Sequence, residues 1–292
     1  MPEGAAVARY VSEFVGTYLV VLTVGCNVLV GSSTWAALSI GSVLMVATYA
    51  LAASSGANFN PAVSLSLGLT GKMGWDEVSI YALVQLVGGG LAAGTYIALF
   101  GENFALGPSR GYDPARAAVT ELLYTFMLCF VYLSVVTSKK HADKDQFFGL
   151  AIGAVIVAGG YAGGHISGAC FNPAVAFGID ASNMKLTWFL IYSVVQLLGA
   201  GLASVVYSVV RPDDFTPKVI DNYPLVSKLT AEFVGVYLLV LTVGLNVLGQ
   251  SPAGALSIAA AVVCMIFSLG SCSGAHINPA VTLAIVASGR SK

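Results

Sequence analysis

The chain has 292 residues, of which 57% are hydrophobic and only 9% are charged, and its mean hydropathy is +0.84. Because soluble domains carry roughly 25% charged residues, this composition indicates an integral membrane protein. The formal net charge of -1 argues against nucleic acid and other strongly electrostatic partners, and the five scattered cysteines have neither zinc-site nor disulfide-framework spacing, so we expect no metal and no cofactor.

Eight apolar stretches have the length of about 20 residues that a membrane-spanning helix requires. They lie at about 10–30, 35–54, 78–100, 117–137, 147–165, 186–209, 229–248 and 253–271. After the second, fifth and eighth stretches comes an Asn-Pro-Ala sequence, followed by an apolar run too short to span a bilayer. We therefore expect short half-helices at these three places.

Each Asn-Pro-Ala lies in a nine-residue segment that occurs three times, at residues 55–63, 167–175 and 273–281. Asn is a favoured N-cap residue and Pro favours the first turn of a helix, so each segment reads as a loop that leads into a new helix. Non-helical backbone at membrane depth is tolerated only where it is buried in protein or lines a water-filled cavity. The segments therefore predict a pore or a binding site.

The sequence contains a strong internal repeat, since residues 13–29 and 232–248 are identical at 14 of 17 positions. A complete unit reads as two spans, a half-helix and a third span that carries a Tyr-x-x-x-Gln-Leu pattern, beginning at Tyr81 and again at Tyr192. Three spans per unit invert successive units in the membrane, as in many transport folds. Pairs of glycines in the third spans predict close helix approach; they are Gly88, Gly89, Gly199 and Gly201.

The predicted fold is thus an all-α integral membrane protein built from inverted repeats of three transmembrane helices plus a re-entrant half-helix. Its predicted parts are a first half-repeat (1–104), a second half-repeat (113–210), a cytoplasmic linker (211–228) and an incomplete third half-repeat (229–292) of two spans and a half-helix. With the N-terminus inside, ten Lys and Arg residues fall on the inner side and three on the outer side. This asymmetry predicts a cytoplasmic N-terminus.

Paired Asn-Pro-Ala half-helices, a Glu early in the first span of each unit and the Gln-bearing third span resemble the aquaporin family of major intrinsic proteins. The resemblance covers residues 7–210 as a whole channel and 228–289 as a partial third half. It implies that two half-helices enter from opposite faces and meet at the midplane, where their positive N-terminal ends and the asparagine amides exclude ions and protons. The pore residues carried over are Asn60, Pro61, Ala62, Asn172, Pro173 and Ala174.

The resemblance also implies roles for two acids and four constriction residues. Glu13 and Glu121 would accept the free N–H groups of the backbone ahead of each half-helix, and we favour this scaffold role over proton transfer. Counting along the motif places the selectivity constriction at Ile40, Gly160, Ala169 and Val175. Family members usually carry Arg where this chain has Val175. The resulting ring is wide and apolar, which predicts passage of solutes larger than water.

The expected function is a passive channel for water and small neutral solutes, among them glycerol, urea, ammonia or hydrogen peroxide. The family resemblance implies a homotetramer in the lipid bilayer with a pore through each protomer. A non-conducting membrane protein of adhesion or assembly is an alternative, because an apolar constriction can stay dry. A secondary transporter is another, although the spans carry no acid cluster beyond Glu13, Glu121 and Glu232. We do not expect an enzyme, because paired acids and a nucleophile–base set are lacking.

The third motif and one histidine leave their roles open. Asn278, Pro279 and Ala280 would need a fourth half to pair with. We expect residues 1–212 to form the working pore and 229–292 to be either the remnant of a second channel or part of a tandem array. His165 precedes the second motif, where a loop-packing role is favoured over a place at the pore mouth.

Overall fold

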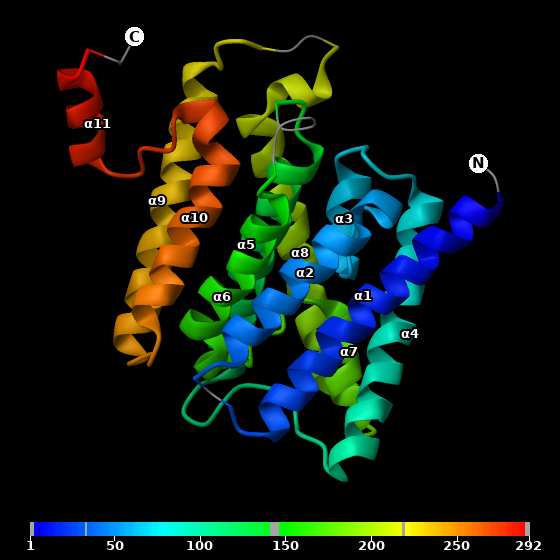
Figure 1. Ribbon diagram of the computed structural model, residues 1–292. Coiled ribbons are helices and arrows are strands. Elements are labelled where there is room, and N and C mark those ends of the chain that lie inside the picture. The colour runs from blue at the N-terminus through cyan, green and yellow to red at the C-terminus, as the bar shows by residue number, and fades with distance from the viewer. Residues whose placement is uncertain (1–2, 33, 141–145, 218–219, 290–292) are drawn as a thin grey trace.

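The computed structural model consists of α-helices arranged in three consecutive units (Figure 1). It describes residues 3–32, 34–140, 146–217 and 220–289. The first unit contains α1 (Glu3–Leu29), α2 (Ala36–Ser55), the half-helix α3 (Pro61–Leu69) and α4 (Trp75–Phe100). The second contains α5 (Pro114–Tyr132), α6 (Phe148–Ser167), the half-helix α7 (Pro173–Ser182) and α8 (Thr187–Val210). The third contains α9 (Leu225–Leu248), α10 (Gly254–Ser273) and the half-helix α11 (Pro279–Ala287).

The described residues include eight helices that are long and apolar enough to cross a membrane, and each overlaps one of the predicted spans. A π-helical turn (Leu133–Thr137) extends α5, and a 3-10 turn (Pro212–Phe215) follows α8. The predicted all-α fold, in which each unit has two long apolar helices followed by a half-helix, is therefore confirmed for the described residues.

The half-helices begin where the sequence places their caps. Asn60, Asn172 and Asn278 have extended backbone, and each side-chain oxygen accepts the N–H of the residue two positions later at 2.8 Å. Pro occupies the first helical position in all three, where its missing N–H costs no hydrogen bond. In Figure 1, α3 lies in the upper part of the bundle and α7 in the lower part. The two half-helices therefore enter from opposite ends.

Glycines let helices approach one another closely, both within each of the first two units and between them. A Cβ added to Gly89 would lie 2.5 Å from the Ala174 carbonyl oxygen, and one added to Gly199 would lie 2.5 Å from the Leu122 carbonyl oxygen. Only glycine permits these approaches of α4 to α7 and of α8 to α5. Gly88 is similarly close to a backbone oxygen, at 2.9 Å. The prediction for Gly201 is wrong, because a Cβ there would meet open space.

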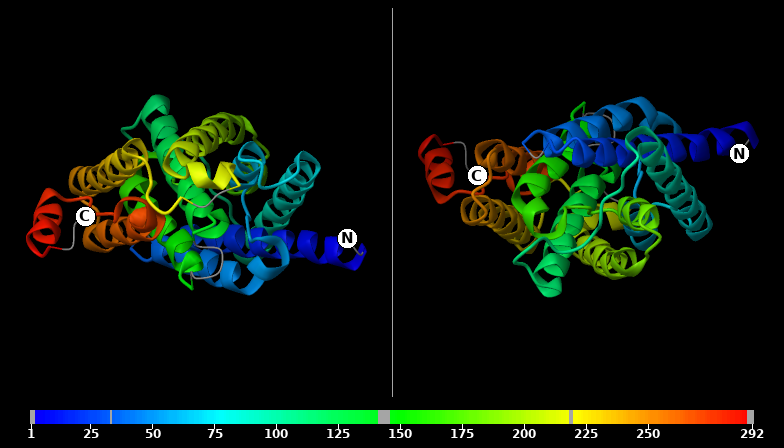
Figure 2. Two further views of the ribbon diagram at one scale, coloured as in Figure 1. Left: turned by 90° about the horizontal axis from the view of Figure 1, so that it is seen from above. Right: turned by 90° about the horizontal axis from the view of Figure 1, so that it is seen from below.

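The third unit packs laterally against the helices of the second unit. Helices α9 and α10 lie against α5 and α6 in Figure 1 and in both views of Figure 2. The Ser257 hydroxyl donates to the Ala158 carbonyl at 2.7 Å, and the hydroxyls of Tyr124 and Thr242 are 3.0 Å apart. By contrast, α11 has no buried residue and stands at the edge of the molecule (Figures 1 and 2). Two of the three helices of this unit are therefore anchored and the half-helix is not.

The linker after α8 begins with buried charge rather than solvated polar residues. The Arg211 guanidinium is buried and donates to the Ser268 carbonyl and the Ser271 hydroxyl, each at 2.6 Å. The Tyr223 hydroxyl donates to the Asp213 carboxylate at 2.9 Å. Burial raises the pKa of Tyr223 to about 12, so this phenol is a neutral donor at physiological pH. These contacts tie the linker to the end of α10.

Candidate functional site: a cavity between two opposed loops

A cavity of about 400 Å³ lies between α1, α2, α5 and α6 and the two loops that precede α3 and α7. Most of its lining is aliphatic or aromatic. Both motif asparagines, Asn60 and Asn172, face it. The four residues predicted for the constriction all line it as well; they are Ile40, Gly160, Ala169 and Val175. The prolines and alanines of the two motifs (Pro61, Ala62, Pro173 and Ala174) instead form the buried first turns of α3 and α7.

The two loops are joined by an exchange of hydrogen bonds. The Asn60 amide donates to the Phe171 carbonyl at 2.8 Å, and the Asn172 amide donates to the Phe59 carbonyl at 2.8 Å. Each asparagine oxygen is already used as the helix cap. Because a primary amide carries two N–H donors, each asparagine keeps one N–H for a molecule in the cavity. The sequence predicted asparagines at the meeting point but not this reciprocal bond.

The loops hold backbone conformations that non-glycine residues rarely adopt. Phe59 and Phe171 have φ of 51° and 50°, and Ala57 and Ala169 have φ of 60° and 53°. Left-handed backbone at such residues costs on the order of 1–3 kcal/mol each and persists only where the surroundings determine it. Gly56, with φ of 89°, begins the first turn, as its place in the motif predicted. The strain explains why each loop needs a fixed acceptor for its N–H groups.

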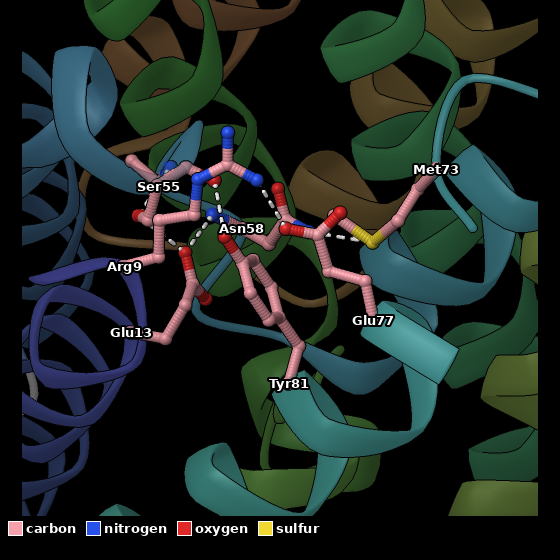
Figure 3. A network of polar contacts seen from close by, with 8 residues as sticks. Arg9, Glu13, Ser55, Asn58, Met73, Glu77 and Tyr81 are labelled. Atoms are coloured by element: carbon pink, nitrogen blue, oxygen red, sulfur yellow. Dashed lines mark hydrogen bonds and ion pairs between the residues drawn. The ribbon is translucent and has the colours of Figure 1, made fainter. Parts of the chain in front are cut away.

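That acceptor is a buried glutamate from the first helix of the same unit. The Glu13 carboxylate accepts the N–H groups of Asn58 and Phe59 at 2.9 and 2.8 Å, the Ser55 hydroxyl at 2.6 Å and the Gln85 amide at 2.7 Å. Figure 3 shows Glu13 beneath the loop, with Ser55 and Asn58 above it. A carboxylate has about four acceptor positions, so these four donors occupy all the acceptor positions of Glu13.

The second unit repeats this arrangement. The Glu121 carboxylate accepts the N–H groups of Cys170 and Phe171 at 3.0 and 2.7 Å, the Ser167 hydroxyl at 2.7 Å and the Gln196 amide at 2.8 Å. Neither Glu13 nor Glu121 lines the cavity, and both are 0% exposed. This geometry supports the scaffold role over proton transfer.

The Tyr-x-x-x-Gln pattern of the third spans now has a physical reason. The Tyr81 hydroxyl donates to the Ser55 carbonyl at 2.9 Å, and one helical turn later Gln85 reaches the carboxylate (Figure 3 draws Tyr81). Tyr192 donates to the Ser167 carbonyl at the same distance. Residues four apart lie on one helix face. The third span of each unit therefore contacts both the last residue of the unit's second helix and the glutamate of its first helix.

The third motif has the same local geometry, but no loop among the described residues lies opposite it. Glu232 accepts the Ser273 hydroxyl at 2.6 Å and the N–H groups of His276 and Ile277 at 3.0 and 2.6 Å. The motif residue Asn278 caps α11 and is exposed, as are Pro279 and Ala280. None of the residues of this motif lines the cavity.

The cavity is also lined by a histidine whose role the sequence did not decide and by a turn that the sequence did not predict to be there. His165 lines it, and the His165 ring also makes an edge contact with Tyr112 at a centroid distance of 5.6 Å. Three residues of the turn between α9 and α10 line it too, namely Gly249, Ser251 and Pro252. Nothing in the sequence links this turn to the first two units, because their contact depends on how α9 and α10 pack against α5 and α6.

Comparison with known proteins places these features in one family. A family model described as Major intrinsic protein matches residues 3–207 and 219–291. Aquaporin NIP1-1 of Zea mays is 32% identical over 216 residues, which are 70% of this chain and 75% of the relative. Nodulin-26 of Glycine max is 32% identical over 217 residues, 70% of this chain and 79% of the relative. The X-ray structure of the aquaglyceroporin from Plasmodium falciparum matches with a TM-score of 0.64 and 24% identity, covering 72% of this chain and 98% of that chain, and shows a common fold.

Proposed function

The chain belongs to the major intrinsic protein family, whose aquaporins are channels and not enzymes, and on that basis we propose that its first two units form the pore. It is a multi-pass integral membrane protein of a family of channels for water and small neutral solutes. The solutes we assign to it are water and uncharged molecules of the size of glycerol or urea, with ammonia and hydrogen peroxide in the same class. The observation that carries this proposal is the cavity that the two asparagine-linked loops share.

Exclusion of ions follows from the two half-helices. Each N-terminus carries the equivalent of roughly half a positive charge, and α3 and α7 begin at Asn60 and Asn172, which face the cavity. A cation there meets two positive helix ends without a compensating carboxylate, because Glu13 and Glu121 lie behind the loops. A water or hydroxyl oxygen accepts an asparagine N–H, which orients the molecule and interrupts a proton-conducting file of waters.

Solute size follows from the four constriction residues. Ile40, Gly160, Ala169 and Val175 present no charge to the cavity, and Gly160 adds no side chain. Aquaporin-type selectivity depends on pore diameter and on the donors that line the pore. A constriction without a cationic side chain is wider and less polar, which favours solutes larger than water.

We further propose a cytoplasmic N-terminus and a homotetramer with one pore in each protomer. The orientation rests on the ten-to-three distribution of Lys and Arg across the two sides. The assembly rests on the resemblance to aquaporins. Native mass spectrometry of the detergent-solubilised chain measures the assembly directly, and a monomeric mass would contradict it.

The test is stopped-flow light scattering on proteoliposomes that contain the full chain. We expect water and glycerol fluxes well above those of empty vesicles. Val175→Arg restores a cation to the constriction and should lower glycerol flux by about tenfold, with a smaller loss of water flux, because the pore narrows.

The matched control is Val281→Arg at the same place in the third motif, where the side chain is 42% exposed and outside the cavity. It should leave both fluxes unchanged. Equal fluxes in folded protein and empty vesicles would contradict the channel function and favour a non-conducting role.

A further inference from the structure

The cavity is lined at one end by the third unit. Gly249, Ser251 and Pro252 belong to the turn between α9 and α10, and they line the same space as His165. In the first unit the corresponding helix ends line that space, through Val28 in the last turn of α1 and Ala36 at the start of α2. The α9–α10 turn of the third unit and the corresponding helix ends of the first unit therefore line one cavity.

Buried hydrogen bonds fix the α9–α10 turn in this place. Thr242, one helical turn before Asn246, is paired with Tyr124 of α5. The Asn246 amide donates to the Ser257 hydroxyl at 2.8 Å, which itself donates to the Ala158 carbonyl of α6 at 2.7 Å. Because unmade buried hydrogen bonds are costly, α9 and α10 cannot slide along the second unit without a large penalty. The turn is thus held at a defined height beside the cavity.

Close packing joins the turn to His165. A Cβ added to Gly249 would lie 2.2 Å from Cε1 of the His165 ring, so the ring rests directly on the glycine backbone. The same two residues also line a second, apolar cavity of about 450 Å³ between α5 and α9. His165 and Gly249 therefore stand between the central cavity and this neighbouring space.

We propose that the α9–α10 turn is part of the outer entrance of the pore and that, together with His165, it limits the size of solute that reaches the constriction. This inference rests on the proposed channel function. The entrance is the one opposite the N-terminus, because α9 starts on the side of the N-terminus and crosses once (Figure 1). The third unit then acts on conduction through its turn, whereas its own Asn-Pro-Ala motif does not face the cavity.

The experiment uses two single-cysteine additions to the full chain. Pro252 is exposed and lines the cavity, whereas Gln250 is exposed in the same turn and does not line it. Pro252→Cys and Gln250→Cys in proteoliposomes are treated with membrane-impermeant methanethiosulfonate reagents of increasing size, and mass spectrometry verifies the labelling. The unsubstituted chain, treated identically, corrects for the native cysteines.

Labelled P252C should lose glycerol flux by about tenfold with the largest reagent, and water flux by less, because the label narrows the entrance. Labelled Q250C should keep both fluxes. Full labelling of P252C without loss of flux, or a P252C thiol that the reagent does not reach, would overturn the inference. Unlabelled protein without any flux would instead overturn the channel function. S251C provides the same test if P252C does not fold.

A second pair of variants tests the contact with His165. Gly249→Ala must displace the His165 ring, whereas Gly244→Ala on the same helix meets no atom within 4 Å. G249A should change the ratio of glycerol to water permeability, and G244A should not. Identical ratios in the two variants would show that the turn does not shape the entrance.

Discussion

The first and third units have similar first helices and the same local motif structure, yet of these two motifs only that of the first unit lines the cavity. In both, a glutamate of the first helix accepts the N–H groups of the loop, and an asparagine caps the half-helix. The first unit meets an inverted partner, so Asn60 bonds the opposite loop and is 2% exposed. Asn278 is exposed, and no loop in the described part of the chain lies opposite it. Local sequence therefore builds the motif, and the opposing unit makes it a site.

The largest expected difference concerns the loop-holding glutamates. Glu121→Leu leaves two backbone N–H groups and the Ser167 and Gln196 donors without an acceptor at a fully buried place. Such losses cost on the order of 5 kcal/mol or more together, which is comparable with the whole stability of many proteins. We expect no folded channel by size-exclusion chromatography in detergent.

The matched variant is Glu232→Leu, whose donors belong to a loop that is less buried than the one held by Glu121. It should give folded protein with normal water flux. Equal loss of folded protein in both variants would mean that the third unit is as essential to the fold as the second.

A smaller difference is expected where each loop packs on a glycine. A Cβ at Gly16 would lie 2.1 Å from the Phe59 ring, which is 1% exposed and whose carbonyl is held by Asn172. Overpacking of this kind costs about 1–3 kcal/mol. Gly16→Ala should therefore lower the thermal midpoint in detergent.

The equivalent variant is Gly235→Ala, where the Cβ would lie 2.5 Å from Ile277. Ile277 leads into the exposed α11, which has room to shift. A smaller drop in the midpoint is expected, and a larger drop for G235A than for G16A would contradict the comparison.

Substitution of the motif asparagines should affect proton leak as well as stability in the first unit, but not proton leak in the third. Asn60→Ala removes a helix cap and the bond to the Phe171 carbonyl, for a total of about 1–2 kcal/mol. It also removes a donor from the cavity, so proton leak into proteoliposomes, followed with an internal pH dye, should rise. Asn278→Ala removes only an exposed cap and should leave proton leak unchanged. Higher leak from N278A would assign the third motif to the conduction path.

The smallest expected effect on stability comes from the basic residue near the start of the first helix in the first and third units. Arg9 pairs with Glu77 of α4 at 2.7 Å near the surface (Figure 3). The equivalent Lys228 instead donates to Asn222 of the linker at 2.7 Å. Arg9→Ala should cost at most about 1 kcal/mol, measured as a shift of thermal midpoint that disappears at high salt. Lys228→Ala should produce no salt-dependent shift.

The sequence alone determined the parts of this protein that depend on near neighbours in the chain. The spans follow from the length of apolar runs, and Asn60, Asn172 and Asn278 start half-helices because capping and the proline ring act within one turn. The resemblance to aquaporins predicted that Glu13 and Glu121 hold the loops, and in the structure both carboxylates accept loop N–H groups.

Only the tertiary structure decided which surfaces meet. The membrane helices are apolar around most of their circumference, so periodicity does not reveal which face contacts protein and which contacts lipid. The exchange between Asn60 and Asn172, the burial of Arg211 and the place of Gly249 beside His165 all depend on such packing. Contacts between residues far apart in the chain are fixed by the shapes of whole helices, which is why the third unit reaches the cavity through its turn and not through its motif.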